Sequence, residues 1–273
     1  MARSAPRTHR PMSNSTEERL GGPGSVCIYG GSFNPMHSAH IRVAVALHEA
    51  AGMERVDIMP AATPPHKPNC RLLPMSLRMA MARAVEARLN TGGSASPTHY
   101  RVSDLEARRT GPSYTVDTLR EYRRTEPDAR LFFCLGATDM IVLDTWHAWR
   151  ELFELATFVV VTRGANDVQD VLEFMGRYPD LFPDASSEIR ALSAGFGGEY
   201  PHSGPEYAHI HWRGGWAPFM TMPRQDVSGS MIRTLWRADR SLLGLMPECV
   251  EDVLLANAPA VDAAWGARDS AQG

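Results

Sequence analysis

Residues 26–40 decide the fold class and read VCIYGGSFNPMHSAH. The run opens with a short apolar segment, Val26 to Tyr29, which is typical of a buried strand. Gly30 and Gly31 follow, and glycines let the backbone turn sharply and approach an anion closely. From Ala39 onward the apolar residues recur at helical spacing, and a helix start offers oriented N–H groups and a positive dipole end. A strand, a glycine turn and a helix in this order predict an α/β protein with a phosphate-binding first turn.

The same alternation of strands and helices continues along the chain. After the first strand, the predicted strands are 55–59, 98–102, 131–135, 157–162 and 217–222. The predicted helices are 39–51, 77–89 with Ser76 as its cap, one from Ser113 or Thr115 to about Arg124, 228–236 and 247–256. Parallel neighbours need crossover connections, so we expect a Rossmann-like doubly wound parallel sheet with helices on both faces and a short C-terminal helical part. Ligands of such sheets bind at the carboxyl ends of the strands.

The two chain ends and one internal region lack this pattern. Residues 1–24 hold arginines, serines and prolines but few apolar residues, so we expect a disordered tail, with an organelle-targeting peptide as the alternative. Residues 25–257 are expected to form the main folded domain, with 164–215 as an insertion or elaborated loop region. Residues 258–273 are expected to be a C-terminal tail.

The composition argues against two classes of partner. Lys and Arg number 28 against 31 Asp and Glu, a formal net charge of -3, which leaves no overall positive field for DNA or a membrane surface. No apolar run reaches the roughly 18 residues that cross a bilayer. The 4 cysteines form no CxxC pair. We therefore expect a cytoplasmic protein that binds neither nucleic acid nor membrane, and a homo-oligomer stays open.

His37 and His40 stand at the start of the first predicted helix and face the same side of it. They can donate hydrogen bonds to phosphate oxygens whose charge grows during group transfer. A zinc pair and two solvated histidines are the alternatives, but zinc would need a third ligand, and neither cysteine nor carboxylate lies nearby in sequence. Ser228 is predicted to begin a second anion-binding helix, with Arg233 about one turn further on. Two such helix starts together suit a triphosphate.

These segments resemble a known family. Residues 30–40 resemble the GG(T/S)F(D/N)PxHxGH signature of the nucleotidyltransferase superfamily, and residues 228–233 resemble its (I/V)SSTxIR motif. Residues 64–67, residues 112–119, and Gly136 with Asp139 and Trp146 are similar to the pattern of bacterial nicotinate-mononucleotide adenylyltransferases. The sequence departs from the pattern at Ala39 and Gly229, which replace a usual Gly and Ser, at Ser230, which replaces Thr, and at His147, where Tyr is common.

The resemblance implies transfer of AMP from ATP to nicotinate mononucleotide, with pyrophosphate released and Mg²⁺ carried on the ATP phosphates. No other metal is implied. The implied catalytic residues are His40, His37 and Arg233. The implied ATP-binding residues are Gly30, Gly31, Ser32, Phe33, His37, His40, Gly136, Asp139, Ser228, Ser230 and Arg233. The implied acceptor-binding residues are Ser32, Lys67, Tyr114, Thr115 and Trp146.

Several alternatives stay open at this point. Lys67 could be a solvated surface residue, Asp139 a helix N-cap and Trp146 a core residue. The acceptor could be nicotinamide mononucleotide, or both mononucleotides. A different class of function is an ATP-binding sensor that does not turn over.

Overall fold

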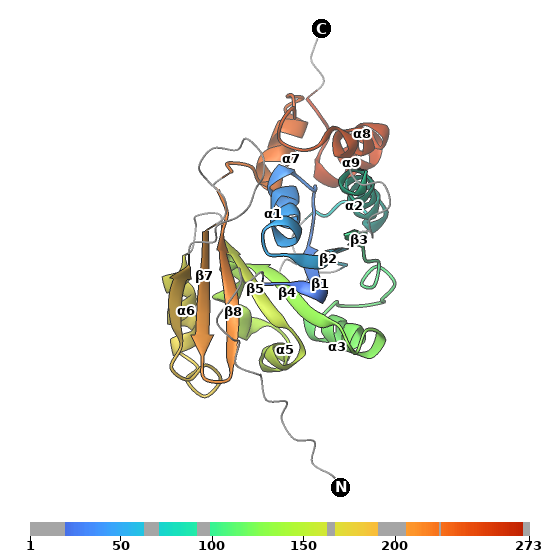
Figure 1. Cartoon of the computed structure of the whole chain (residues 1–273). Helices are drawn as coiled ribbons and strands as arrows, with labels where there is room; N and C mark the ends of the chain where they lie inside the picture. The colour runs from blue at the N-terminus through green and yellow to red at the C-terminus, as the bar shows by residue number, and fades with distance from the viewer. Residues whose placement is uncertain are drawn as a thin grey trace.

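The computed structural model describes residues 20–62, 71–91, 99–162, 167–190, 206–223 and 225–269. Its strands are β1 (Gly22–Gly31), β2 (Met53–Pro60), β3 (Tyr100–Val102), β4 (Arg130–Gly136), β5 (Thr157–Thr162), β6 (Ser186–Arg190), β7 (Glu206–Trp212) and β8 (Gly215–Thr221). They form one sheet in the order β3-β2-β1-β4-β5-β8-β7-β6 (Figure 1). The strands from β3 to β8 along this order are parallel, whereas β7 runs antiparallel to both β8 and β6.

Helices cover both faces of this sheet (Figure 1). They are α1 (Ser38–Glu49), α2 (Met75–Asn90), α3 (Thr115–Thr125), α4 (Ala137–Met140), α5 (Trp149–Leu155), α6 (Val168–Gly176), α7 (Gly229–Arg237), α8 (Glu248–Ala256) and α9 (Ala258–Trp265), with a 3₁₀ turn η1 at Leu143–Thr145.

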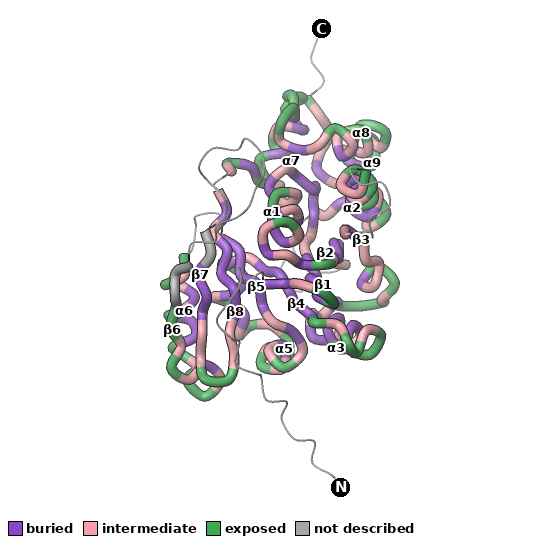
Figure 2. The backbone as a smooth tube through the Cα atoms, viewed as in Figure 1, coloured by how far each residue is buried: buried purple, intermediate pink, exposed green. Residues whose placement is uncertain are grey.

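Alternation along the central strand β1 creates two separate cores. Val26 and Ile28 pack with residues of α3, α4, α5 and α6, whereas Cys27 and Tyr29 pack with residues of α1, α2, α7, α8 and α9. Successive side chains of a strand point to opposite faces, so a strand covered on both sides is apolar throughout. Figure 2 shows this as a band of buried backbone through β1, β4, β5 and β8.

The predicted doubly wound parallel sheet with helices on both faces is confirmed. The strand at 157–162 and the helices at 39–51 and 77–89 lie within two residues of their predicted ends. The predicted cap Ser76 is wrong, because α2 begins at Met75 with Pro74 as its N-cap residue. The helix predicted from Ser113 or Thr115 begins at Thr115, after the N-cap residue Tyr114.

Three expected boundaries need correction. The region 164–215 contains α6 and the strands β6 and β7, which extend the sheet with antiparallel pairs. The expected tail after 258 begins with α9, whose Trp265 side chain is 3% exposed. At the other end β1 already begins at Gly22, and Leu20 before it is buried, so the irregular segment predicted to reach residue 24 ends earlier. Residues 1–19 lie outside the described residues.

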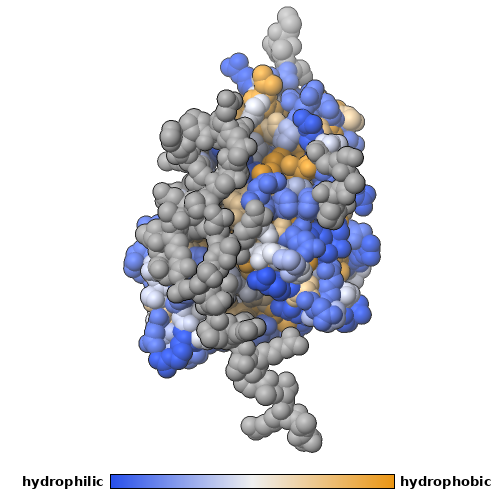
Figure 3. Space-filling view, viewed as in Figure 1, coloured by the Kyte–Doolittle hydropathy of each residue, from blue (hydrophilic) through white to orange (hydrophobic). Residues whose placement is uncertain are grey.

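The surface around α2 and α3 is largely polar (Figure 3). Helix α3 buries Val116, Leu119 and Tyr122 and exposes arginines on its other side, as an amphipathic surface helix does. Figure 3 shows hydrophilic residues over much of the described surface at the right of the view, where α2 and α3 lie. Among the described helices, none is both long and apolar enough to span a membrane.

Candidate active site

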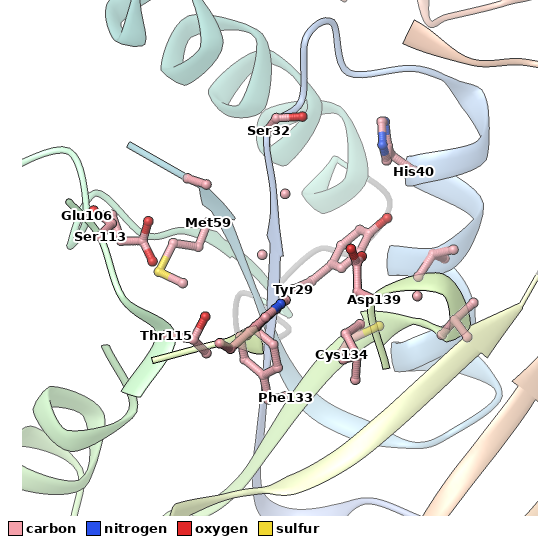
Figure 4. Close-up of a pocket in the computed structure, with 18 of the residues that line it drawn as sticks. Tyr29, Ser32, His40, Met59, Glu106, Ser113, Thr115, Phe133, Cys134 and Asp139 are labelled. Carbon is pink, nitrogen blue, oxygen red and sulfur yellow. The ribbon is translucent and has the colours of Figure 1, made fainter. Parts of the chain in front are cut away.

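One cavity of about 360 Å³ opens at the carboxyl ends of the central parallel strands. Its wall combines the end of β1, the start of α1, the segment before α3, and the segment after β4 (Figure 4). This is where the topology of a doubly wound sheet places ligands. Of the predicted site residues, nine line the cavity: Gly30, Gly31, Ser32, His40, Tyr114, Thr115, Gly136, Asp139 and Trp146.

The β1–α1 turn is shaped by close packing beneath it. A Cβ atom on Gly31 would lie 2.9 Å from the ring of Phe33, so the position accepts only glycine without a shift. Phe33 has a φ of +42°, and its ring is 1% exposed, in edge-to-face contact with Tyr29 and His40. The side chain of Phe33 therefore packs inside the protein against the turn and does not line the cavity.

His40 is the histidine that faces the cavity. Its Nδ1 accepts a hydrogen bond from the backbone N–H of His37 at 3.2 Å, which also caps the start of α1. Because Nδ1 acts as an acceptor, the proton of the neutral ring resides on Nε2. His40 can thus present an N–H donor to a ligand in the cavity, at the positive end of the α1 dipole.

His37 lies beneath His40. The two rings stack with centroids 3.7 Å apart, and His37 is 2% exposed. His37 does not line the cavity, so the two histidines predicted to face a ligand together have different positions. His37 instead provides the packing and the backbone N–H that orient the ring of His40.

The second predicted helix start adjoins the first. Ser228 caps α7, with its Oγ accepting from the N–H of Met231 at 3.2 Å and lying 3.0 Å from the Oγ of Ser230. Arg233 donates from Nη1 to the carbonyl of Asn34 at 2.8 Å, within the β1–α1 turn. The starts of α1 and α7 therefore converge at one edge of the sheet. Ser228, Ser230 and Arg233 lie beside the cavity and are not part of its wall.

Asn34 is the residue on which this convergence depends. Its side chain is 7% exposed, donates to the carbonyl of Arg71 and accepts from the N–H of Leu73 at 3.0 Å. The same Oδ1 accepts from Nε1 of Trp265 in α9 at 3.2 Å. A Cβ atom on Gly229 would lie 2.9 Å from the Asn34 carbonyl oxygen, which explains why glycine occupies this position of α7.

Two buried side chains of opposite charge, Arg78 and Glu106, stabilise the part of the site at the ends of β1 and β2. Arg78 is 2% exposed and donates to the carbonyls of Ser32, Ala61, Ala62 and Leu73. Burial lowers the pKa of Arg78 from its ordinary value, and the negative charge of Glu106 opposes that change. Glu106 is 5% exposed and accepts from the N–H of Ala62 and from the hydroxyl of Thr118, both at 3.1 Å. The ends of β1 and β2 and the first turn of α3 are thus joined through charged hydrogen bonds, which are among the stronger ones.

Aromatic rings form the wall next to α3. The rings of Tyr114 and His147 pack at a centroid distance of 4.5 Å with a tilt of 36°, and both residues line the cavity together with Trp146 and Thr115. Trp146 is half-buried, so it is a residue of the cavity rim as well as a packing residue of the core. Among the described residues, the side chain of the N-cap residue Tyr114 makes no capping hydrogen bond. The N–H groups of Asp117 and Thr118 donate to the Tyr114 carbonyl, so those of Thr115 and Val116 are the ones that this helix start offers to a ligand.

Asp139 supplies a carboxylate on the side of the cavity nearest His40 (Figure 4). It lies inside α4, and Gly136 is the N-cap residue of that helix, so the alternative that Asp139 is the cap is wrong. The thiol of Cys134 is also in the cavity wall, where burial raises its pKa and keeps it protonated.

Sequence reasoning missed several residues of the wall. The missed residues are Tyr29, Val43, Met59, Ala61, Glu106, Ser113, Phe133, Cys134, Leu135, Thr138, His147 and Val161. Glu106 follows β3 at the carboxyl edge of the sheet, so the strand-end rule could have found it. Lys67 was predicted to bind the acceptor, but it lies outside the described residues.

The chain was compared with known proteins. A family model described as cytidylyltransferase-like matches residues 28–235. The chain is 32% identical over 223 residues to a probable nicotinate-nucleotide adenylyltransferase of Geobacter metallireducens, covering 82% of this chain and 92% of that protein. It is 33% identical over 236 residues to a probable nicotinate-nucleotide adenylyltransferase of Citrifermentans bemidjiense, covering 86% of this chain and 98% of that protein.

The fold is shared with solved structures. Nicotinic acid mononucleotide adenylyltransferase of Plasmodium falciparum, solved in complex with NaAD, matches with a TM-score of 0.58 and 15% identity, over 86% of this chain and 97% of that one. A putative nicotinate-nucleotide adenylyltransferase from Vibrio parahaemolyticus matches with a TM-score of 0.52 and 13% identity, over 88% of this chain and 97% of that one. At these identities the likeness shows a common fold.

Proposed function

Because the chain belongs to the cytidylyltransferase-like family and, within it, to the nicotinate-nucleotide adenylyltransferases, we propose that its cavity joins the AMP part of ATP to nicotinate mononucleotide. A phosphate oxygen of the acceptor attacks the α-phosphorus of ATP. The bond from the α-phosphorus to the bridging oxygen breaks, and pyrophosphate leaves with the electron pair. The product is nicotinate adenine dinucleotide, and no protein nucleophile takes part.

The observation that best supports this proposal is the position of His40. Its Nε2 donor, the glycine turn and the start of α1 lie at one cavity that also reaches Tyr114, Thr115 and Trp146. One ligand phosphate can therefore meet His40 while a ring occupies the aromatic wall. Catalysis would consist of positioning and of stabilising the charge that grows on the α-phosphate.

The other roles follow from the two helix starts. Ser32 would hold the acceptor phosphate, while Ser228, Ser230 and Arg233 would hold the β- and γ-phosphates. Asp139 would accept hydrogen bonds from the ribose hydroxyls. Tyr114 and Trp146 would contact the pyridine ring, and N–H groups at the start of α3 near Thr115 would bind its carboxylate. Lys67 stays a proposed acceptor-binding residue, and a cytoplasmic location stays part of the proposal.

Magnesium would accompany ATP. Within the residues that the structure describes, no three His, Cys, Asp or Glu side chains gather as a metal site. Mg²⁺ retains several waters and is commonly held through substrate phosphates with one or two carboxylates, so this wall is compatible with an ion held mainly by the triphosphate. When bound, the ion neutralises phosphate charge.

Pyrophosphate release is expected to be faster with nicotinate mononucleotide than with nicotinamide mononucleotide. Nicotinate carries a carboxylate where nicotinamide carries an amide. Binding of this carboxylate is favoured by the helix start at Thr115, whose N–H groups carry partial positive charge. The measurement compares kcat/KM for the two acceptors under the same ATP concentration. A higher kcat/KM with the amide would overturn the acceptor assignment while leaving the adenylyl transfer in place.

Replacing Arg233 with methionine is expected to raise the KM for ATP about tenfold or more, because a charge-assisted contact to phosphate is lost. Arg237→Met is the matched control, since Arg237 lies one turn further along α7 and is exposed. Arg233→Lys keeps the charge but not the planar donor geometry and should be intermediate. Equal KM values for ATP in Arg233→Met and Arg237→Met would exclude the assigned phosphate contact.

A sensor that binds ATP without turnover is the alternative from another class. ATP would then protect the protein against thermal unfolding, yet no pyrophosphate would appear with either acceptor.

A further inference from the structure

Ser113 combines burial, position and an unused hydrogen-bonding group. It lines the cavity and is 7% exposed. Among the described residues, its hydroxyl has no hydrogen-bond partner. A buried polar group without a partner costs free energy, so its presence in a cavity wall calls for a ligand that completes it.

The surroundings of Ser113 indicate which part of a ligand it would meet. Figure 4 shows Ser113 beside Glu106 and Met59, across the cavity from His40 and Asp139. His40 belongs to the phosphate-binding end at the start of α1, whereas Ser113 immediately precedes the N-cap residue of α3. A ligand that places its phosphate near His40 would therefore place its ring near Ser113.

The charges at the Ser113 end of the cavity add a second argument. The Glu106 carboxylate lies in the same wall and already accepts from the N–H of Ala62 and the hydroxyl of Thr118. An anionic ring substituent beside this carboxylate would be repelled unless hydrogen-bond donors face it. The first N–H groups of α3 are such donors, and the O–H of Ser113 is another at the same end.

We propose that Ser113 is an acceptor-binding residue whose hydroxyl donates a hydrogen bond to the carboxylate of the pyridine ring. The proposal rests on the proposed function and specifies one contact of it. Ser113 takes no part in proton transfer, so its effect belongs to acceptor binding.

Ser113→Ala is the variant that tests this contact. It is expected to raise the KM for nicotinate mononucleotide about tenfold, the size of a lost hydrogen bond to a charged group, with the KM for ATP unchanged. The melting temperature without ligands should stay the same or rise, because the substitution removes a buried hydroxyl that has no partner. Ser113→Thr keeps the hydroxyl and should retain most of the acceptor affinity.

Ser25→Ala is the matched control. Ser25 is fully buried, and its hydroxyl donates to the carbonyl of Gly22 and accepts from the N–H of Glu54. This variant should lower the melting temperature and leave both KM values unchanged. Ser25→Ala should thus lower the stability without weakening acceptor binding, whereas Ser113→Ala should weaken acceptor binding without lowering the stability.

Two results would overturn the proposal. One is a lower melting temperature of Ser113→Ala with an unchanged acceptor KM, which would mean that the hydroxyl is bonded within the protein. The other is an equal rise of both KM values, which would indicate a general distortion of the cavity.

Binding without turnover separates this proposal from the proposed function. Nicotinate mononucleotide alone should raise the melting temperature of the wild type more than that of Ser113→Ala. An equal rise in both would overturn the contact even if the wild type releases pyrophosphate. Absence of pyrophosphate from the wild type with either acceptor would instead refute the proposed function.

Discussion

Replacing His40 with alanine is expected to lower the turnover number about hundredfold while leaving the affinity for ATP nearly unchanged. The side chain contacts the α-phosphate most strongly when its charge grows, so the loss falls on the transition state and not on the bound substrate. The Nε2 donor is fixed by the hydrogen bond that Nδ1 accepts from the N–H of His37. The measurement is the rate of pyrophosphate release at saturating substrates, with ATP binding determined separately by calorimetry.

His40→Asn separates the two functions of this ring. An asparagine oxygen can still accept from the N–H of His37 and cap α1, but its amide does not extend to the position of Nε2. This variant should match the wild type in melting temperature and His40→Ala in turnover. His48→Ala, on the same helix but outside the cavity wall, should retain full turnover. Wild-type turnover in His40→Ala would remove this residue from the mechanism.

Replacing Arg78 with methionine is expected to lower the free energy of unfolding by about 3–5 kcal/mol, close to the largest effects of single substitutions. The carbonyls of Ser32, Ala61, Ala62 and Leu73 would lose a buried donor, and Glu106 would lose its neighbouring positive charge. Methionine preserves most of the side-chain volume, so the loss reports the guanidinium and not a cavity. Urea unfolding with an unchanged m-value is the measurement.

Arg83→Met is the matched control for Arg78→Met. Arg83 lies on the same helix α2 and is exposed, so its replacement should change the free energy of unfolding by no more than about 0.5 kcal/mol. Arg78→Lys should recover little, because one compact ammonium cannot reach four carbonyls. If Arg78→Met were as stable as Arg83→Met, the hydrogen bonds of Arg78 would contribute no net stability.

The central sheet could be predicted because its strands are buried on both faces. The runs at 26–29, 131–135 and 158–161 are apolar without interruption, which distinguishes them from the helices between them. The strands β6 and β7 lack such runs, and β6 begins with Ser186, Ser187 and Glu188. The pairing of β7 with β8, and of β6 with β7, comes from tertiary context, so 164–215 was predicted as irregular.

The helix α9 was missed for a similar reason. Its eight residues bury Val261 and Trp265, but so short a segment shows little periodicity. Its position depends on contacts with residues far away in sequence, such as the hydrogen bond from Trp265 to Asn34. The periodicity of apolar residues within a short segment contains no information about such long-range contacts.

The candidate site was predictable where backbone geometry sets it. The glycine turn ends β1, His40 lies in the first turn of the helix that follows, and Asp139 comes three residues after β4, so the strand-end rule locates them. The burial of Arg78 could not be inferred, because an arginine on an amphipathic helix is ordinarily exposed and its acceptors are backbone carbonyls from three separate segments. The stacking of His37 beneath His40 also depends on packing that helical spacing does not describe.

The contact of Asn34 with Trp265 has a consequence for protein synthesis. The two residues are separated by 231 positions, so ribosomes translate the glycine turn long before its last partner exists. Arg233 likewise reaches the Asn34 carbonyl only after 199 further residues have been added. The nascent chain therefore cannot complete the surroundings of this turn while those segments are still being added, and the finished arrangement of Asn34 arises only after α9 has left the exit tunnel.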